Sequence, residues 1–559
     1  MIKVARTNVQ IWPFSVCAVL TLTSAALAAK LPEAKDSQPA TVESVNVVLP
    51  KDARPVLRNI AALFARQVQQ RCGARVELDR AAALRVELSI KPGIGAEGFR
   101  ITDGPPATIR IVGNDERGVL YGVGKFLHTS QYQRAGFTPG VWRGHSVPQK
   151  PIRGIYFATH FDNFYDAAPI AKVCEYAQEL GLWGFNSLGI WYDMHDFAGF
   201  DDPKAVADRR RIGRILQSAR DIGVGTTILV IANEGDQLTS PALREHSQHD
   251  DYGKRYICPN APGGMDCLTK VMTAEFAWAE AFQPEYLILW PHDPGGCECA
   301  QCAPWGANGY LKCAQALALL GKKQLPGVKI ILSTWWFNEK EWHGLEEKFR
   351  NKPDWCDVLM SDGRLIGGLP SVEFPEISMY GNDPWGGFGA NIMIARLWTL
   401  WNQRKERVER GWPYSEGIYE DMNKICCSQL YWQDRPVAET IKEYAAFEFS
   451  PAVADDVATV VKILEKNTFS IDESARQAFV RVRQIDAKLP VRTRQSWRWR
   501  ILYLRAQLGK EMLERNKGKR FQYEGARLDS EVFKQAFSEL KKIYHGENAA
   551  ACVKPPVIK

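Results

Sequence analysis

The sequence predicts a (β/α)8 barrel that follows a small N-terminal α/β domain and precedes a helical C-terminal region. At 559 residues the chain is too long for one ordinary hydrophobic core. After Pro151, short apolar strand patterns alternate with amphipathic helical patterns, as in folds built on parallel sheets. About eight such units fit into about 280 residues, which favours a TIM (β/α)8 barrel over an open sheet.

The N terminus has the pattern of a secretory signal peptide over residues 1–28. A short basic start precedes an apolar run over 11–22, and small residues surround the expected cleavage position after Ala28. We therefore expect an exported protein, periplasmic or extracellular. A membrane anchor is the alternative, but the run is short for a span and contains Pro13. No later stretch is long and apolar enough to span a bilayer, so we expect no membrane contact after cleavage.

The composition, 45% hydrophobic and 24% charged, is typical of a globular protein. The formal net charge of +7 is mild for this length and does not predict a nucleic-acid partner. The sharpest basic stretch, 492–520, contains Trp497 and Trp499. A solvated helix face with buried tryptophans explains it better than a nucleic-acid surface.

Residues 43–148 are expected to form the N-terminal α/β domain, because alternating strand patterns there surround two helical ones. The strand patterns cover 45–48, 84–90, 99–101 and 107–112, and the helical patterns cover 56–71 and 116–127. Residues 436–559 are expected to be helical. Their apolar residues recur at helical spacing over 438–447, 453–466, 475–488, 496–515 and 530–544.

The barrel itself is expected over residues 150–435. Its eight strands are predicted at 154–159, 186–191, 226–231, 286–290, 329–334, 358–360, 377–380 and around 413–416. Its helices are predicted at 169–180, 204–222, 268–282, 309–322, 345–351, 395–410 and 419–432.

The predicted strand ends collect carboxylates, amides, histidines and tryptophans on one rim, where barrels place their reactive residues. This mixture suits a sugar, because aromatic faces stack on pyranose C–H surfaces and two carboxylates supply acid and base. The catalytic candidates are Asp293, Glu416, Glu420 and Asp362. The substrate-binding candidates are His160, Asn163, Trp191, Asn233, Glu234, His292, Trp336, Tyr380 and Trp385.

Four of these strand ends carry a family resemblance. They are 157–165 (FATHFDNFY), 290–302 (WPHDPGGCECAQC), 380–389 (YGNDPWGGFG) and 414–421 (YSEGIYED). Together with the helix over 116–127, they resemble a group of exported bacterial proteins built like glycoside hydrolase families 20 and 67. The resemblance covers about 115–435 and implies an accessory-like N-terminal domain before a catalytic barrel. The chain departs from family 20 after strand 4, where His292-Asp293 replaces an adjacent Asp-Glu pair.

The leading hypothesis is a glycosidase with a carbohydrate substrate and no cofactor. Asp293 is the expected general acid and Glu416 the expected base or nucleophile, with Glu420 and Asp362 as substitutes. Glu234 is assigned to binding or to a reserve catalytic role. A separation of about 5–5.5 Å between the two carboxyl groups would predict retention, and about 6.5–9.5 Å inversion.

A cysteine cluster in the loop after strand 4, which also carries Asp293, leaves other hypotheses about function open. Cys297, Cys299 and Cys302 could bind zinc if Cys258 or His292 supplied a fourth ligand. A disulfide that holds the loop over the site is an equally good interpretation in an exported protein. We expect the loop to be structural, without a catalytic metal. The alternatives to a glycosidase are a metal-dependent hydrolase that uses this cluster and a non-catalytic carbohydrate-binding barrel.

The glycines of the 380–389 stretch could in principle surround a phosphate. They are Gly386, Gly387 and Gly389, and no lysine follows them. A tight rim loop that passes close to a ligand is the better interpretation.

Overall fold

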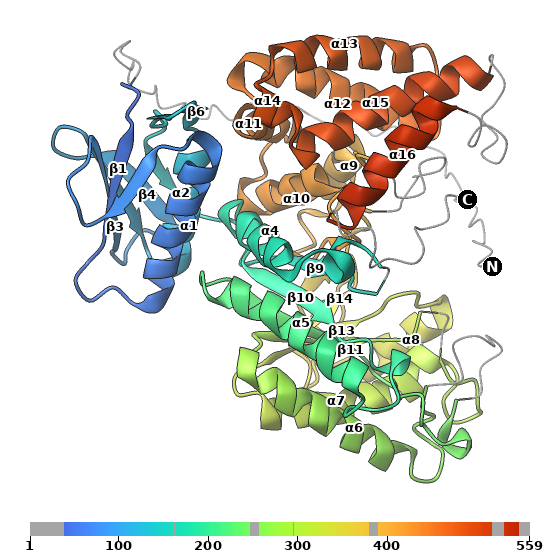
Figure 1. Cartoon of the computed structure of the whole chain (residues 1–559). Helices are drawn as coiled ribbons and strands as arrows, with labels where there is room; N and C mark the ends of the chain where they lie inside the picture. The colour runs from blue at the N-terminus through green and yellow to red at the C-terminus, as the bar shows by residue number, and fades with distance from the viewer. Residues whose placement is uncertain are drawn as a thin grey trace, which may run out of the picture. The chain divides into compact units, whose positions relative to one another are not determined.

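The computed structural model describes residues 39–160, 162–245, 256–293, 296–378, 389–516 and 530–546 (Figure 1). From Pro39 onward the chain forms one compact unit. The predicted signal peptide lies outside the described residues, as do Tyr380, Trp385, Gly386 and Gly387. Among the described helices, none is both long enough and apolar enough to cross a membrane.

The N-terminal region is a six-stranded sheet in the order β2-β1-β3-β5-β4-β8. Its strands are β1 (Ser44–Val48), β2 (Arg75–Leu78), β3 (Leu84–Ile90), β4 (Phe99–Asp103), β5 (Thr108–Gly113) and β8 (Gly144–Ser146). Helices α1 (Pro55–Cys72) and α2 (Glu116–His128) bury their apolar faces in its core. Pro55 begins α1 because a first-turn residue needs no N–H partner, and Gly73 ends it in the left-handed conformation with φ of 73°.

Eight parallel strand positions close into the predicted barrel. They are β9 (Ile152–Phe157), β10 (Ser187–Trp191), β11 (Gly225–Ile231), β12 (Tyr286–Trp290), β13 (Lys329–Ser333), β14 (Val358–Met360), β15 (Ser371–Glu373), and β16 (Arg410–Gly411) together with β17 (Tyr414–Ser415). Strand β9 closes the ring, because it pairs with β10 on one edge and with β16 and β17 on the other. The strands are buried on both faces, which explains their nearly continuous apolar sequences.

Helices surround this ring (Figure 1). They are α4 (Ile170–Leu182), α5 (Pro203–Arg220), α6 (Gly264–Ala279), α7 (Gly309–Gln324), α8 (Glu339–Lys348), α9 (Ile394–Arg404) and α10 (Asp421–Gln433). The ring of strands separates two apolar cores. One core lies between strands and helices. The other fills the barrel interior and includes Tyr156, Ile288 and Trp412. Trp412 packs so closely on β9 that a Cβ added to Gly154 would lie 2.2 Å from its Nε1 atom.

Two of the predicted strands need correction. The seventh strand is β15, so the prediction at 377–380 is wrong. The three residues of β15, Ser371-Val372-Glu373, lack an apolar run because only Val372 lies in the interior core. The eighth strand is split into β16 and β17 at Trp412-Pro413, and Pro413 has no N–H to give to a ladder. The short strands β2, β6 (Gln131–Gln133), β7 (Gly136–Thr138) and β8 were not predicted.

The C-terminal region is helical, as predicted. Its helices are α11 (Val437–Glu448), α12 (Ala454–Phe469), α13 (Ser474–Lys488), α14 (Val491–Arg494), α15 (Trp497–Asn516) and α16 (Glu531–Tyr544). Some basic side chains of α15 point inward and form ion pairs with acidic residues. Arg498 pairs with Asp421 at 2.9 Å and with Glu179 at 2.8 Å, and Trp499 is buried.

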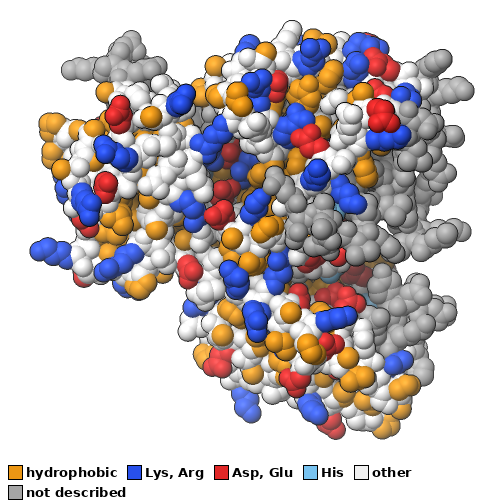
Figure 2. Space-filling model, in the orientation of Figure 1, with side chains coloured by type: hydrophobic (Ala, Val, Ile, Leu, Met, Phe, Trp, Pro, Cys, Tyr) orange, Lys and Arg blue, Asp and Glu red, His pale blue; other side chains and the backbone are white. Residues whose placement is uncertain are grey.

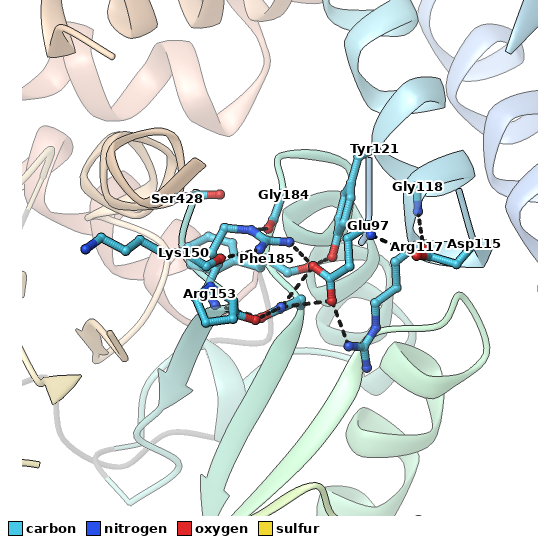
Figure 3. A network of polar contacts seen from close by, with 12 residues as sticks. Glu97, Asp115, Arg117, Gly118, Tyr121, Lys150, Arg153, Gly184, Phe185 and Ser428 are labelled. Carbon is cyan, nitrogen blue, oxygen red and sulfur yellow. Dashed lines mark hydrogen bonds and ion pairs between the residues drawn. The ribbon is translucent and has the colours of Figure 1, made fainter. Parts of the chain in front are cut away.

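A buried polar network joins the N-terminal sheet to the first barrel strand (Figure 3). Arg153 of β9 is fully buried and forms an ion pair with Glu97, which also accepts from Arg117 at 2.9 Å. The Arg153 guanidinium also donates to the carbonyls of Gly184, at 2.7 Å, and Lys150, at 2.8 Å. Although burial opposes ionisation, the two guanidiniums hold the pKa of Glu97 below its ordinary value.

The substitution Glu97→Gln should lower the free energy of unfolding by about 3–5 kcal/mol, because it leaves the buried Arg153 charge without its counter-ion. Urea unfolding of the purified protein measures this change. The control is Glu87→Gln on β3, which breaks the partly exposed contacts with Arg85 and Arg110 and should cost about 1 kcal/mol or less. Equal losses in the two variants would contradict the prediction.

A second ion-pair cluster predicts acid sensitivity. Glu443 of α11 accepts from Lys125 of α2 at 2.9 Å and from Arg435 at 2.6 Å. Burial opposes ionisation, yet these cations lower the pKa of Glu443 from 4.5 to about 2. A depressed folded-state pKa stabilises the protein above the unfolded value, so this contribution should disappear as the pH falls from about 4.5 towards 2. Melting temperatures across that range should fall less steeply in Glu443→Gln than in the wild type.

Candidate active site

Aromatic side chains form a connected surface inside the barrel at the carboxyl ends of its strands. The Trp290 ring contacts Phe374 at 4.9 Å between centroids, and Phe374 contacts Tyr414 at 5.8 Å. Tyr414 in turn stacks on Tyr156 at 5.6 Å. Trp335, which follows β13, extends the surface from Trp290 at 5.5 Å. These rings form a connected, largely buried apolar floor, and aromatic faces of this kind can stack on the C–H face of a sugar.

Three carboxylates that follow barrel strands are each hydrogen-bonded to an interior aromatic residue, and Glu234 among them is fully buried. The pairs are Trp191 Nε1 to Glu234 at 2.9 Å, Trp290 Nε1 to Asp293 at 2.9 Å, and the Tyr414 hydroxyl to Glu416 at 2.8 Å. Each carboxylate follows a different barrel strand, namely β11, β12 and β17. Figure 2 shows acidic side chains gathered with a histidine on one face of the molecule.

Asp293 has the environment of a proton donor. Burial raises the pKa of its carboxyl group, and the Trp290 N–H only partly opposes this effect. A raised pKa keeps a larger share of the carboxyl protonated near neutral pH, as a general acid requires. The Trp290 bond also fixes the direction of the side chain above the aromatic floor.

Glu416 lies across the ring from Asp293. With β9 counted as the first position of the ring, β12 is the fourth and β16–β17 is the eighth. The fourth and eighth positions lie opposite each other in a closed ring of eight strands. Glu416 is partly exposed, and burial followed by the nearby Glu376 carboxylate raises its pKa. Its backbone N–H donates to Ser378 Oγ at 2.9 Å. Two carboxyl groups therefore lie at opposite sides of the aromatic floor.

The pairing of Glu234 with His195 was not predicted. His195 Nδ1 lies 2.7 Å from Asp193 Oδ1 and 3.1 Å from Glu234 Oε1. Burial opposes the charged imidazole, but the two carboxylates raise the pKa of His195 to about 10. The sequence placed Asp193 and His195 after strand 2, but spacing alone does not show that they meet a residue from strand 3. Asp193, His195 and Asp196 could also offer ligands to a metal ion.

Two predicted binding residues lie beneath the rim instead of on it. Asn233 is fully buried and donates to Glu245 at 2.9 Å. His292 is also buried, with its Nδ1 atom 3.5 Å from Glu245 and its ring 3.7 Å from that of Tyr256. These contacts join the loops after β11 and β12 and position the neighbouring Glu234 and Asp293.

Other predicted residues are engaged in local structure. Glu420 is buried and accepts from Ser415 at 2.7 Å and from the Gly417 N–H at 2.9 Å. Asp362 accepts from the Phe374 N–H at 3.1 Å and pairs with Arg404 of α9 at 3.3 Å. Glu420 is therefore engaged with the segment around Gly417, and Asp362 with the backbone of Phe374 and with Arg404.

The remaining binding candidates divide between the surface and the interior. Asn163 is fully buried, where it accepts from the Tyr165 N–H at 2.9 Å at the start of α3 (Phe164–Ala167). His160 is partly exposed and contacts the Trp191 ring at 5.0 Å. Trp336 is 68% exposed beside Trp335, so its face is open to a ligand.

The cysteines after β11 and β12 form the other group that could hold a metal. The sulfur atoms of Cys258, Cys297, Cys299 and Cys302 all lie within 4.8 Å of one another. No disulfide is formed in the described part of the chain.

Comparison with solved structures relates this architecture to known enzymes. BtGH115A, a family GH115 4-O-methyl-α-glucuronidase with specificity for decorated arabinogalactans, matches with a TM-score of 0.64 at 11% identity, over 93% of this chain and 79% of that chain. The GH20 exo-β-N-acetylglucosaminidase from Vibrio harveyi matches with a TM-score of 0.52 at 11% identity, over 76% of each chain. The fold is that of glycoside hydrolases. This result confirms the fold expected from the family resemblance, whereas no protein-family model and no curated protein sequence matches.

Removing one of the two carboxylates beside His195 should lower its pKa. In Glu234→Gln the imidazolium keeps Asp193 but loses a charge at 3.1 Å, so the pKa of His195 should fall by about 1 unit or more. Imidazole NMR titration of wild type and variant measures the shift, with the exposed His343 as an internal control. An unchanged His195 titration would show that Glu234 does not stabilise the imidazolium.

Proposed function

We propose that the protein is a glycoside hydrolase that uses Asp293 and Glu416 as its acid and base pair. The observation that carries the proposal is the placement of these carboxyl groups on opposite strands of one ring, each bonded to an aromatic residue of the same connected floor. The shared fold with glycoside hydrolases supports it. The substrate is a glycan, which an exported enzyme would meet outside the cytoplasm.

In this mechanism Asp293 donates its proton to the glycosidic oxygen as the bond to the anomeric carbon breaks. Burial raises the pKa of Asp293, which favours the protonated form that a proton donor needs. Trp290 holds the acid in place through its N–H, and the aromatic floor carries the apolar face of the sugar.

Glu416 acts from the other side of the sugar, either on water as a base or on the anomeric carbon as a nucleophile. Burial and the neighbouring Glu376 carboxylate raise the pKa of Glu416, which opposes the ionised form that a base or nucleophile needs. Positive charge that develops on the sugar favours the ionised form of Glu416 in the transition state. Glu420 and Ser378 position the chain around Glu416, because both bind the segment that carries it.

The residues around Glu234 would bind the substrate. Glu234, Asp193 and His195 form a charged cluster beside Trp191, which suits hydrogen bonds to sugar hydroxyl groups. Trp336 and His160 would contact the substrate at the edge of the site, because both side chains are accessible to solvent.

The test begins with a screen of the mature protein against aryl glycosides and complex glycans. On a natural-linkage substrate, Asp293→Asn should lose at least about 100-fold in kcat, because an amide cannot donate the proton. The loss should be smaller on a dinitrophenyl glycoside, whose leaving group needs little protonation. Glu416→Gln should lose at least about 100-fold on both substrates.

Two further variants separate catalysis from binding. Glu234→Gln should mainly raise KM, because it removes a hydroxyl acceptor and leaves the acid and base intact. Glu298→Gln, an exposed position on the same loop as Asp293, is the control and should keep wild-type turnover. An inactive Glu234→Gln with an active Glu416→Gln would show that the second carboxylate is wrongly assigned. Glycan binding without turnover by the wild type would favour the non-catalytic alternative.

A further inference from the structure

Four cysteines from two separate loops converge below the barrel rim. Cys258 lies between β11 and α6, and the other three lie between β12 and α7. The Cys258 sulfur is 3.9 Å from both the Cys299 and the Cys302 sulfurs. Three of the four side chains are buried, and Cys299 is partly exposed.

The separations are those of a tetrahedral thiolate site. Four sulfurs bonded to one Zn²⁺ at about 2.3 Å lie about 3.8 Å apart along each edge of the tetrahedron. The distances of 3.9 Å from the Cys258 sulfur to the Cys299 and Cys302 sulfurs agree with that edge. A disulfide instead needs two sulfurs about 2.05 Å apart. No disulfide joins these four cysteines, and their sulfur atoms all lie within 4.8 Å of one another, which is the spacing of metal ligands.

Groups around the cluster suit a negatively charged metal centre. Asn260 Nδ2 donates to the Cys302 sulfur at 3.1 Å, as outer-shell donors do to bound thiolates. The Lys312 ammonium bonds Asn260 Oδ1 at 2.7 Å and the Pro259 carbonyl at 2.9 Å. A zinc ion with four thiolates carries two negative charges, and this lysine offsets part of that charge.

We propose that Cys258, Cys297, Cys299 and Cys302 bind one structural zinc ion. All four coordination positions are filled by protein sulfurs, so the ion has no open position for water or substrate. The site therefore does not support a metal-dependent hydrolase. It also replaces the disulfide that the sequence left as an equal alternative.

The ion would fix the loops that carry the candidate active site. Cys297 follows Asp293 by four positions, and Cys258 follows Tyr256, whose ring stacks on His292. Zinc binding thus ties the segment after β12 to the segment before α6. Asp293 is held from one side by Trp290 and from the other by the metal-bound loop.

The first experiment measures metal in the full mature chain purified without added chelator. We expect about one zinc per chain in the wild type and less than about 0.1 in Cys258→Ser. The matched control is Cys356→Ser, a buried free cysteine outside the cluster, which should keep the zinc. A metal-free wild type, or iron in place of zinc, would overturn the proposal.

The second experiment uses only the wild-type chain, so it does not depend on the variant folding. Exchange of the zinc for Co²⁺ should give the intense thiolate-to-cobalt charge-transfer bands of a tetrahedral tetrathiolate site. Four thiols should become alkylatable when zinc is removed by a chelator under native conditions. Intact mass that reveals disulfides among these four cysteines, or absence of the cobalt bands, would refute the site.

Discussion

The buried ion pair between Arg153 and Glu97 is the constraint on which the other parts of the molecule depend. Arg153 lies near the start of β9, and β9 is the strand that closes the barrel on both edges. A fully buried guanidinium must have its charge compensated, and the compensating carboxylate comes from the N-terminal sheet region. This interaction therefore ties the N-terminal region directly to the first barrel strand.

The candidate site depends on a second constraint, which is the size of the side chains that fill the ring. Large aromatic side chains can fill one interior without clashes in only a few arrangements. Ring contacts link Trp290, Phe374, Tyr414 and Tyr156 in one of these arrangements. Their polar atoms then determine where the carboxylates lie. Trp290 donates a hydrogen bond to Asp293, and Tyr414 donates one to Glu416. The packing of these rings therefore determines where the two carboxyl groups lie.

Much of this architecture could be predicted because parallel strands buried on both faces leave a clear apolar pattern. The strand at 286–290 was predicted at its observed bounds, and Asp293 follows from it directly. The strand at 371–373 was missed because three residues with a serine and a glutamate carry too little pattern. Contacts between loops were harder still. Sequence spacing does not reveal that His195 meets Glu234 or that Glu420 binds a backbone N–H. It also left open whether Cys258 or His292 completes the cysteine cluster, and the structure places Cys258 there.

The split eighth strand has a consequence for how the chain reaches its native state. One edge of β9 pairs with β10, which follows closely in the sequence, but the other edge pairs only with residues 410–415. That partner lies about 260 residues away, a contact whose loop-closure entropy must be offset by the packing it completes. Until it arrives, β9 has an open edge with unpaired backbone groups. The first barrel strand to be synthesised is thus among the last to be completed, and Trp412 closes the ring against Gly154 when it docks.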